Sequence, residues 1–149
     1  MRYVVALVLA LVLCGCSSPW DDLAERYPAT DKKPLAKQKQ TIILVGTNHE
    51  GAFSYRGLAS FELDQAGLRM SLDQPAALFS IPVHVPIDSI SACSRISWIP
   101  EFDTPLWIAD AKVEVVLRGY ERETLEWCKS MSKPVVSREI ESKWLHPAQ

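Results

Sequence analysis

The sequence has little of what enzyme active sites and metal sites are built from. Its 149 residues include three histidines and six glycines. Neither a His-Glu-x-x-His nor a Cys-x-x-Cys motif occurs, so the common sequence signatures of a metal site are absent. The glycines are spread along the chain, so there is no glycine-rich phosphate-binding loop. We therefore expect a protein that is not an enzyme and that uses no metal ion or cofactor.

The histidines that remain do not form a catalytic pattern. His49, Glu50 and Ser54 are close in sequence, but no nucleophile elbow or oxyanion loop accompanies them. His84 lies in a segment of alternating polar and apolar residues, where we expect an exposed strand position.

Long runs of one charge are also missing, and the formal net charge is −2. No basic stripe with interleaved aromatic residues is present, which argues against nucleic acid as a partner. The one long hydrophobic run, from Tyr3 to Leu13, has about 11 residues, whereas a membrane-spanning helix needs about 20. A run of this length is typical of the core of a signal peptide.

The hydrophobic run leads into Leu13-Cys14-Gly15-Cys16. This stretch resembles the lipobox of bacterial lipoproteins, with Leu three residues before a cysteine and Gly directly before it. The resemblance implies that residues 1–15 are removed as a signal peptide and that Cys16 becomes lipidated on its thiol and its new amine. Two or more acyl chains would anchor the protein stably in a membrane. Lipidation at Cys14, an uncleaved anchor and an ordinary secretory signal are the alternatives.

The residue that follows the lipobox bears on the choice of membrane. Ser17 stands where lipoproteins retained in the inner membrane of Gram-negative bacteria carry Asp. By the same resemblance, we expect an exported protein on the periplasmic face of the outer membrane, if the host has one.

Two further cysteines, Cys93 and Cys128, lie in the body of the chain. An exported chain meets an oxidising compartment, where a disulfide can form. Such a bond would close a loop of about 36 residues and contribute roughly 4 kcal/mol on the chain-entropy model. However, Cys93 alternates in phase with Ser91 and Arg95, which indicates an outward side chain unless a bulge intervenes. The sequence leaves open whether the two residues form a disulfide or are separate buried thiols.

The first periodic segment after the cysteine is helical. Apolar residues at i, i+3, i+4 and i+7 predict a short amphipathic helix that ends before Pro28: Trp20, Leu23, Ala24 and Tyr27. A helix this short must dock on something. Its own domain is the expected partner, and the membrane surface is the alternative. Residues 29–40 are polar and predict a linker. We therefore divide the chain into a signal peptide (1–15), a lipidated N-terminus with helix and linker (16–40) and a folded domain (41–149).

From residue 41 the pattern changes to a period of two, which indicates strands. The clearest element is a hairpin formed by residues 53–63 and 68–72. Other strands are expected at 41–46, 81–87, 90–98, 106–108 and 113–117. The prolines at 82 and 86 place the 81–87 strand at a sheet edge. Residues 119–131 predict a helix with Trp127 as its core residue, and Val136, Ile140 and Trp144 indicate a short last helix.

This order of elements, with the segment 78–90 and the spacing Trp20-x-x-Leu23-Ala24-x-x-Tyr27, resembles the pleckstrin-homology and GRAM-like domains of small uncharacterised bacterial proteins. The resemblance implies a mainly β fold, in which a bent antiparallel barrel of seven strands is capped by a C-terminal helix. A small β-sandwich is the alternative. Eukaryotic members bind phosphoinositides through basic residues in the first hairpin loop. Here that loop (47–51) lacks such a cluster, so no phosphoinositide site is expected.

One loop has the composition of a protein interface. The segment from Trp98 to Trp107 carries Phe102 among prolines and acidic residues. We expect Trp98, Phe102 and Trp107 to form a partner-binding loop, and the alternative is that they fold back over an open barrel end. The sequence thus predicts a membrane-tethered envelope lipoprotein with a non-catalytic protein-binding or scaffold domain. A small-ligand or lipid-binding barrel and a passive structural protein are the alternatives.

Overall fold

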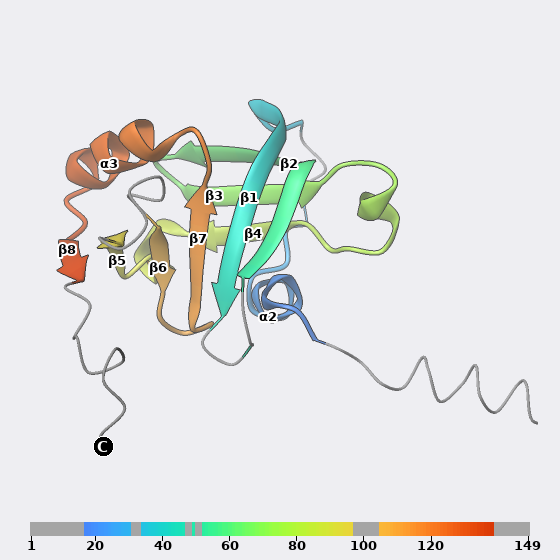
Figure 1. The fold of residues 1–149 in the computed structure, drawn as a ribbon, viewed down its shortest axis with the longest axis horizontal. Coiled ribbons are helices and arrows are strands. Elements are labelled where there is room, and N and C mark those ends of the chain that lie inside the picture. The colour runs from blue at the N-terminus through green and yellow to red at the C-terminus, as the bar shows by residue number, and fades with distance from the viewer. Residues whose placement is uncertain (1–16, 31–33, 47–48, 50–51, 97–104, 139–149) are drawn as a thin grey trace, which may run out of the picture.

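The sheet is the centre of this molecule, and the two described α-helices pack against it (Figure 1). The computed structural model describes residues 17–30, 34–46, 49, 52–96 and 105–138. The elements are helices α2 (Pro19–Arg26) and α3 (Glu121–Ser130), strands β1 (Lys37–Gly46), β2 (Ala52–Asp64), β3 (Gly67–Leu72), β4 (Val83–Pro86), β5 (Ala92–Ile96), β6 (Leu106–Ile108), β7 (Val113–Leu117) and β8 (Val135–Arg138), and 3-10 turns η1 (Ala76–Leu78) and η2 (Ile87–Ser89).

In the described part of the chain the strands form one sheet in the order β4-β3-β2-β1-β7-β6-β5-β8. Strands β1 to β7 pair antiparallel, and β8 is added parallel to β5. The register between β1 and β2 shifts between Lys37 and Ile42, and Lys39 and Gly57 adopt positive φ. Such irregularities bend a sheet. The expected fold class, a bent antiparallel barrel of seven strands with a C-terminal helix, is confirmed.

The predicted hairpin is present as β2 and β3, joined by a tight turn at Asp64–Gly67. The Asp64 carboxylate accepts the Ala66 N–H at 2.8 Å and so closes the turn. Gly67 has a φ of +129°, a backbone conformation that residues other than glycine rarely adopt. A Cβ there would lie 2.1 Å from the Val85 carbonyl oxygen, so this position requires glycine for close packing against β4.

Helix α2 belongs to the core of the domain. Trp20 and Leu23 are almost fully buried among strand residues such as Leu44, and β1 already begins at Lys37. The domain boundary expected at residue 41 is therefore too late, because α2 and the first residues of β1, from Lys37, belong to the same folded unit. Ser18 caps the helix, and its capping box with Asp21 satisfies the free N–H groups of the first turn.

One strand prediction and one helix prediction need correction. Strand β4 lies at the sheet edge as expected, but Ile81 is outside it and 55 % exposed rather than buried. A short last helix was predicted around Val136, where the structure has strand β8 instead. The chain after α3 pairs with the edge of β5 that β6 leaves open. The first hydrogen bond of this pairing is donated by the Cys93 N–H to the Pro134 carbonyl, at 2.8 Å. The remainder of that predicted helix, residues 139–149, lies outside the described residues.

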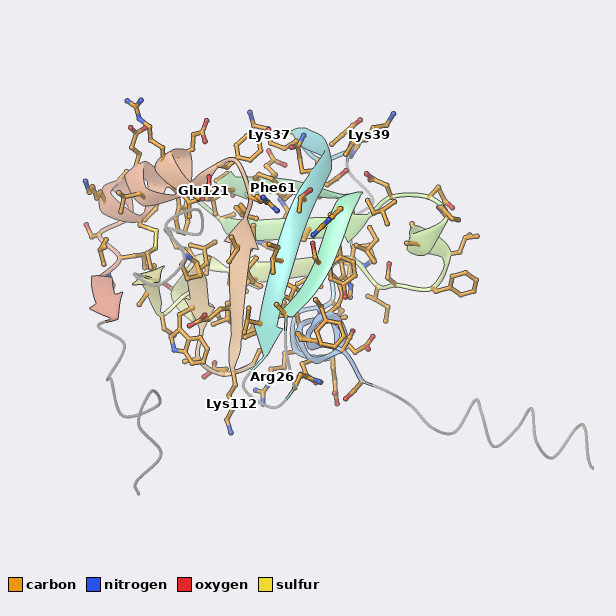
Figure 2. All side chains as sticks on the ribbon, viewed as in Figure 1. Arg26, Lys37, Lys39, Phe61, Lys112 and Glu121 are labelled. Carbon is orange, nitrogen blue, oxygen red and sulfur yellow. A yellow bond between two sulfur atoms is a disulfide. The ribbon has the colours of Figure 1, made fainter. Side chains whose placement is uncertain are left out.

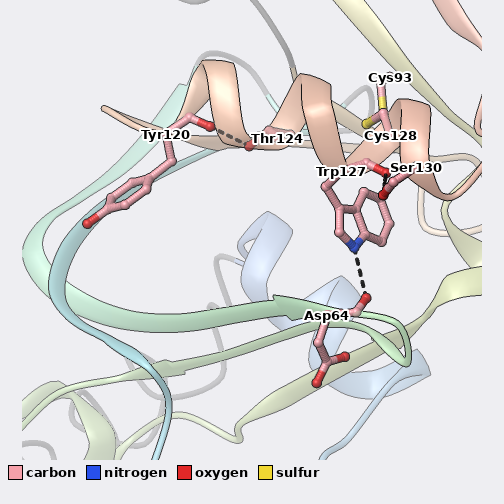
Figure 3. The surroundings of a disulfide bond; sticks show 7 residues. All are labelled: Asp64, Cys93, Tyr120, Thr124, Trp127, Cys128 and Ser130. Atoms are coloured by element: carbon pink, nitrogen blue, oxygen red, sulfur yellow. Dashed lines mark hydrogen bonds between the residues drawn. A yellow bond between two sulfur atoms is a disulfide. The ribbon is translucent and has the colours of Figure 1, made fainter.

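Helix α3 is present where the sequence predicts it, and Trp127 shares its inner face with Thr124 and Cys128. Thr124 and Cys128 are the buried residues, whereas Trp127 is half-buried against the core. Its indole N–H donates to the main-chain oxygen of Asp64 at 2.8 Å, and this bond holds the helix over the end of the β2–β3 hairpin (Figure 3). Trp127 is therefore a clamp between the two elements rather than a core residue.

Candidate functional site

The structure joins Cys93 and Cys128 in a disulfide, with Cα atoms 6.4 Å apart (Figure 3). Cys93 is fully buried, so the expectation of an outward side chain is wrong. Ile90 is fully buried as well, three residues earlier, which shows that the inward–outward alternation breaks between the two positions. The bond ties α3 to β5 and sits beside the point where β8 joins the sheet.

The expected partner-binding loop is not assembled in the described residues. Trp98 and Phe102 lie outside them. Trp107 is a half-buried residue of β6, paired with Ala92 of β5 and Glu114 of β7. The strand predicted at 106–108 is therefore confirmed, and Trp107 lies within it.

A different surface emerges from the path of the chain after α2. The described residues 27–30 and 34–36, which we call the crossing segment, begin along the outer edge of β4. There the Ala29 N–H donates to the Pro82 carbonyl, and the Tyr27 carbonyl accepts the His84 N–H, each at 2.8 Å. The chain then enters β1, where Lys37 pairs with Phe61 of β2. Of the described residues of the crossing segment, Ala29, Pro34 and Leu35 line the same groove as Ser60 of β2 and Arg69 of β3, so they lie over one face of these strands.

The crossed face is the polar side of the hairpin. Ala59 and Phe61 of β2 point into the core, so Ser60 points outward, as does Arg69 of β3. Ser60 is nevertheless only 4 % exposed, which means that other parts of the chain cover it. A groove of about 660 Å³ lies at this face, which we call the outer groove. Its lining includes Leu35 and Gln38 on one side and Ser60, Arg69, Ser71 and Asp73 on the other.

Asp73 fixes one wall of the outer groove. Its carboxylate accepts the Ser60 hydroxyl at 2.7 Å and the Lys39 main-chain N–H at 3.3 Å. The second bond reaches the beginning of β1, where Lys39 adopts positive φ. Asp73 thus joins the end of β3 to the irregular start of β1 and holds the groove open between them.

Arg69 occupies the other end of the outer groove and already has two carboxylate partners. Its Nη2 lies 2.9 Å from oxygens of both Glu62 and Asp64. Burial acts to raise the pKa of Asp64, but the Ala66 N–H and the Arg69 guanidinium outweigh it, so the pKa lies below its usual value. Two carboxylates against one guanidinium leave no excess positive charge here, so the groove is poorly suited to an anion.

His84 pairs across β3 and β4 with Arg69. It is half-buried rather than exposed as expected, because residue 27 of the crossing segment lies along β4 beside it. Its Nε2 has no hydrogen-bond partner in the described part of the chain.

His49 pairs with a residue that the sequence did not single out. Its Nε2 lies 2.7 Å from the Asp22 carboxylate of α2, and its ring contacts Phe53 edge-on, with ring centroids 6.0 Å apart. Ser54 follows Phe53 in β2 and is exposed, so strand alternation turns its side chain away from that contact. The His49–Asp22 pair joins α2 to the β1–β2 connection. The Ser54 side chain does not contact this pair, so the three residues do not form a catalytic triad. His146 lies outside the described residues.

Basic residues lie at both ends of the sheet (Figure 2). Lys37 and Lys39 are at the start of β1, and Arg26 and Lys112 are at the opposite end. The Lys37 ammonium lies 5.1 Å from the centroid of the Tyr120 ring, a cation–π contact that ties β1 to the start of α3. The described residues contain no group of three metal-ligating side chains and no helix long and apolar enough to cross a membrane.

No protein-family model matches the chain, and no curated protein or solved structure is significantly similar to it. The outer groove is therefore defined by its geometry alone. The sequence contained a partial signal for it, because Ser60, Glu62, Arg69 and Ser71 alternate with apolar residues. No sequence pattern indicated that Ala29, Pro34 and Leu35 would lie over these side chains.

Proposed function

We propose that this chain is an envelope lipoprotein of bacteria, lipidated on Cys16, that holds a pleckstrin-homology-like binding domain at the membrane. The tether is supported by the Leu13–Cys16 motif and by Ser17, which favours the periplasmic face of the outer membrane. Helix α2 begins at Pro19 and is packed into the core, so the domain would stand within a few residues of the bilayer.

We propose further that the domain acts without catalysis and binds a protein partner through the outer groove. The groove of about 660 Å³ carries this proposal. Its serine hydroxyls and glutamine amides can donate and accept hydrogen bonds, and Leu35 and Ala77 add apolar surface. Mixed polar and apolar surface of this kind is typical of interfaces between proteins. Arg69 is neutralised by its carboxylate partners, so an uncharged or weakly polar peptide segment fits better than an anion.

The barrel interior offers little support for the alternative of a ligand-binding barrel. Side chains from both halves of the sheet fill the interior, including Leu44, Leu68 and Leu106, each fully buried. A core packed by its own side chains has no room for a lipid. Binding is therefore proposed for the surface of the sheet.

The tether is tested by labelling cells with a clickable fatty acid. Cys16→Ser is expected to lose the label and the cleavage that exposes the new amine. Cys14→Ser, two residues away, is the matched control and is expected to keep both. Label retained in Cys16→Ser and lost in Cys14→Ser would move the modification to Cys14.

The groove is tested by photo-crosslinking in cells from a reactive amino acid at Gln38, an exposed residue of the groove lining. One recurrent envelope protein is the expected adduct. Ser71→Trp should fill the groove and reduce capture at least tenfold. Ser54→Trp, an exposed serine of β2 outside the groove lining, should leave it unchanged. Equal capture in both variants would contradict the groove as the binding site.

A further inference from the structure

The largest exposed apolar side chains of the described residues gather in one loop. Phe79 is 90 % exposed, Leu78 is 70 % exposed and Ile81 is 55 % exposed. We call these three residues the apolar tip. They belong to the loop between β3 and β4, whose residues 74–82 include no charged side chain. Apolar groups concentrated in this way on a surface mark a place of contact with another apolar phase.

The loop is held in shape by its own hydrogen bonds. The Phe79 N–H donates to the Ala76 carbonyl at 3.1 Å, and the Ser80 hydroxyl donates to the same oxygen at 3.2 Å. The Trp20 indole N–H donates to the Ile81 carbonyl at 3.0 Å and so fixes the loop to α2. The backbone therefore presents Phe79 to the outside instead of leaving it free to fold onto the core.

The apolar tip lies beside the place where the chain enters the domain. Phe79 lines the same hollow of about 260 Å³ as Ser18, the N-cap of α2. Figure 1 shows the loop projecting on the side of the molecule from which α2 begins. Ser17 is exposed and is bonded directly to Cys16. Because a residue spans at most about 3.6 Å, a lipid on Cys16 would bring the bilayer to within roughly 7 Å of the helix cap.

We propose that the apolar tip inserts into the lipid surface to which Cys16 is tethered. This inference rests on the proposed lipidation, which supplies the bilayer at this point of the surface. Phenylalanine and leucine on a short projection are suited to the boundary between headgroups and acyl chains. The domain would then be held in one orientation, with the β3–β4 loop in contact with the membrane.

The charges nearby explain why the contact would be hydrophobic and not electrostatic. The first turn of α2 carries Asp21 and Asp22. The Asp21 carboxylate accepts both the N–H and the hydroxyl of Ser18, at 2.7 and 2.8 Å, and Asp22 pairs with His49. These acids have partners within the protein and offer no attraction to anionic lipid. Insertion of the tip is therefore expected not to weaken as the salt concentration rises.

The test uses the full chain in living cells, with a photo-reactive amino acid at position 79. The matched control carries the same amino acid at Val135, which is 42 % exposed on β8, at the other side of the molecule (Figure 1). Fatty-acid labelling of Cys16 is measured on the same samples, and thiol alkylation checks that both variants have formed the Cys93–Cys128 disulfide. Phospholipid adducts are identified by mass spectrometry.

At least tenfold more phospholipid adduct is expected from position 79 than from position 135. Adducts to protein alone, or equal adducts from the two positions, would overturn the inference. The label on Cys16 reports separately on the tether. With the label present, loss of lipid adducts at position 79 refutes the apolar tip and leaves the proposed lipidation intact. With the label absent, the tether has failed, and lipid adducts at position 79 would still support the tip.

Discussion

The indole N–H of Trp127 donates a hydrogen bond of 2.8 Å to the main-chain oxygen of Asp64, which lies 63 residues earlier in the sequence. The same Asp64 accepts the Arg69 guanidinium through its carboxylate, at 2.9 Å. One turn residue therefore links the C-terminal helix to the polar face that lines the outer groove. Stability of the helix and geometry of the groove should depend on one another through this turn.

Trp127→Phe tests this link with little change in packing. The variant keeps an aromatic ring and loses the indole N–H, so the free energy of unfolding should fall by about 1 kcal/mol. Urea denaturation followed by circular dichroism measures it. Trp127→Ala removes the ring contacts as well and should cost more. Equal stability of wild type and Trp127→Phe would show that the bond contributes nothing.

Replacement of both Cys93 and Cys128 by Ala removes the covalent tie between β5 and α3. The free energy of unfolding should fall by roughly 2–5 kcal/mol, because the unfolded chain regains the freedom of the loop between these residues. Unfolding with and without reductant measures the effect. The wild type should lose stability in reductant and the double variant should not. A wild type indifferent to reductant would contradict the disulfide.

Gly67→Ala is expected to be strongly destabilising, by about 3 kcal/mol or more. The new Cβ would meet the Val85 carbonyl oxygen at 2.1 Å, and φ is +129°. Gly57→Ala is the matched control, because Gly57 also has positive φ but has nothing within 4 Å of the added Cβ. It should cost about 1 kcal/mol. Similar losses in the two variants would show that the close approach to β4 is unimportant. Thermal unfolding of both proteins makes the comparison.

Stability at low pH should depend on Asp64. Its pKa in the folded protein lies below the value of 3.8 expected for an exposed Asp, because hydrogen bonds and Arg69 outweigh the effect of burial. The contribution of the carboxylate to stability is therefore present above about pH 4 and is lost as the pH falls through the folded-state pKa. Asp64→Asn should lose less stability than the wild type between pH 4 and pH 2. Asp88→Asn, an exposed carboxylate of η2, is the control and should follow the wild type. Urea denaturation at each pH provides the measurement, and parallel curves for all three proteins would contradict the prediction.

Several elements of the fold were predictable because their determinants are local. The alternation of residues in 53–63 and 68–72 predicts the hairpin of β2 and β3, and Gly67 marks its turn. The spacing of Trp20, Leu23 and Tyr27 predicts helix α2. Each pattern records which side chains share a face, and the period of that pattern identifies the element.

Residues of the sites were harder to predict because their positions depend on distant partners. Cys93 was assigned outward by alternation, but the chain changes phase between Ile90 and Cys93. Trp107 is predicted in the strand 106–108 but also as the end of a partner-binding loop, and the structure pairs it with residues of both neighbouring strands. Such pairings are not recorded in a local period.

The sequence by itself determined the mainly β class of this protein, its hairpin, its two helices and the motif that predicts a lipid on Cys16. All of these rest on neighbours within one turn or one strand. Only the tertiary structure decided that Cys93 meets Cys128, that Ala29, Pro34 and Leu35 lie over the polar face of the hairpin and that Phe79 stands exposed beside the start of α2. The physical reason is that burial on a sheet surface is set by what packs over it, and those partners lie tens of residues away in the chain.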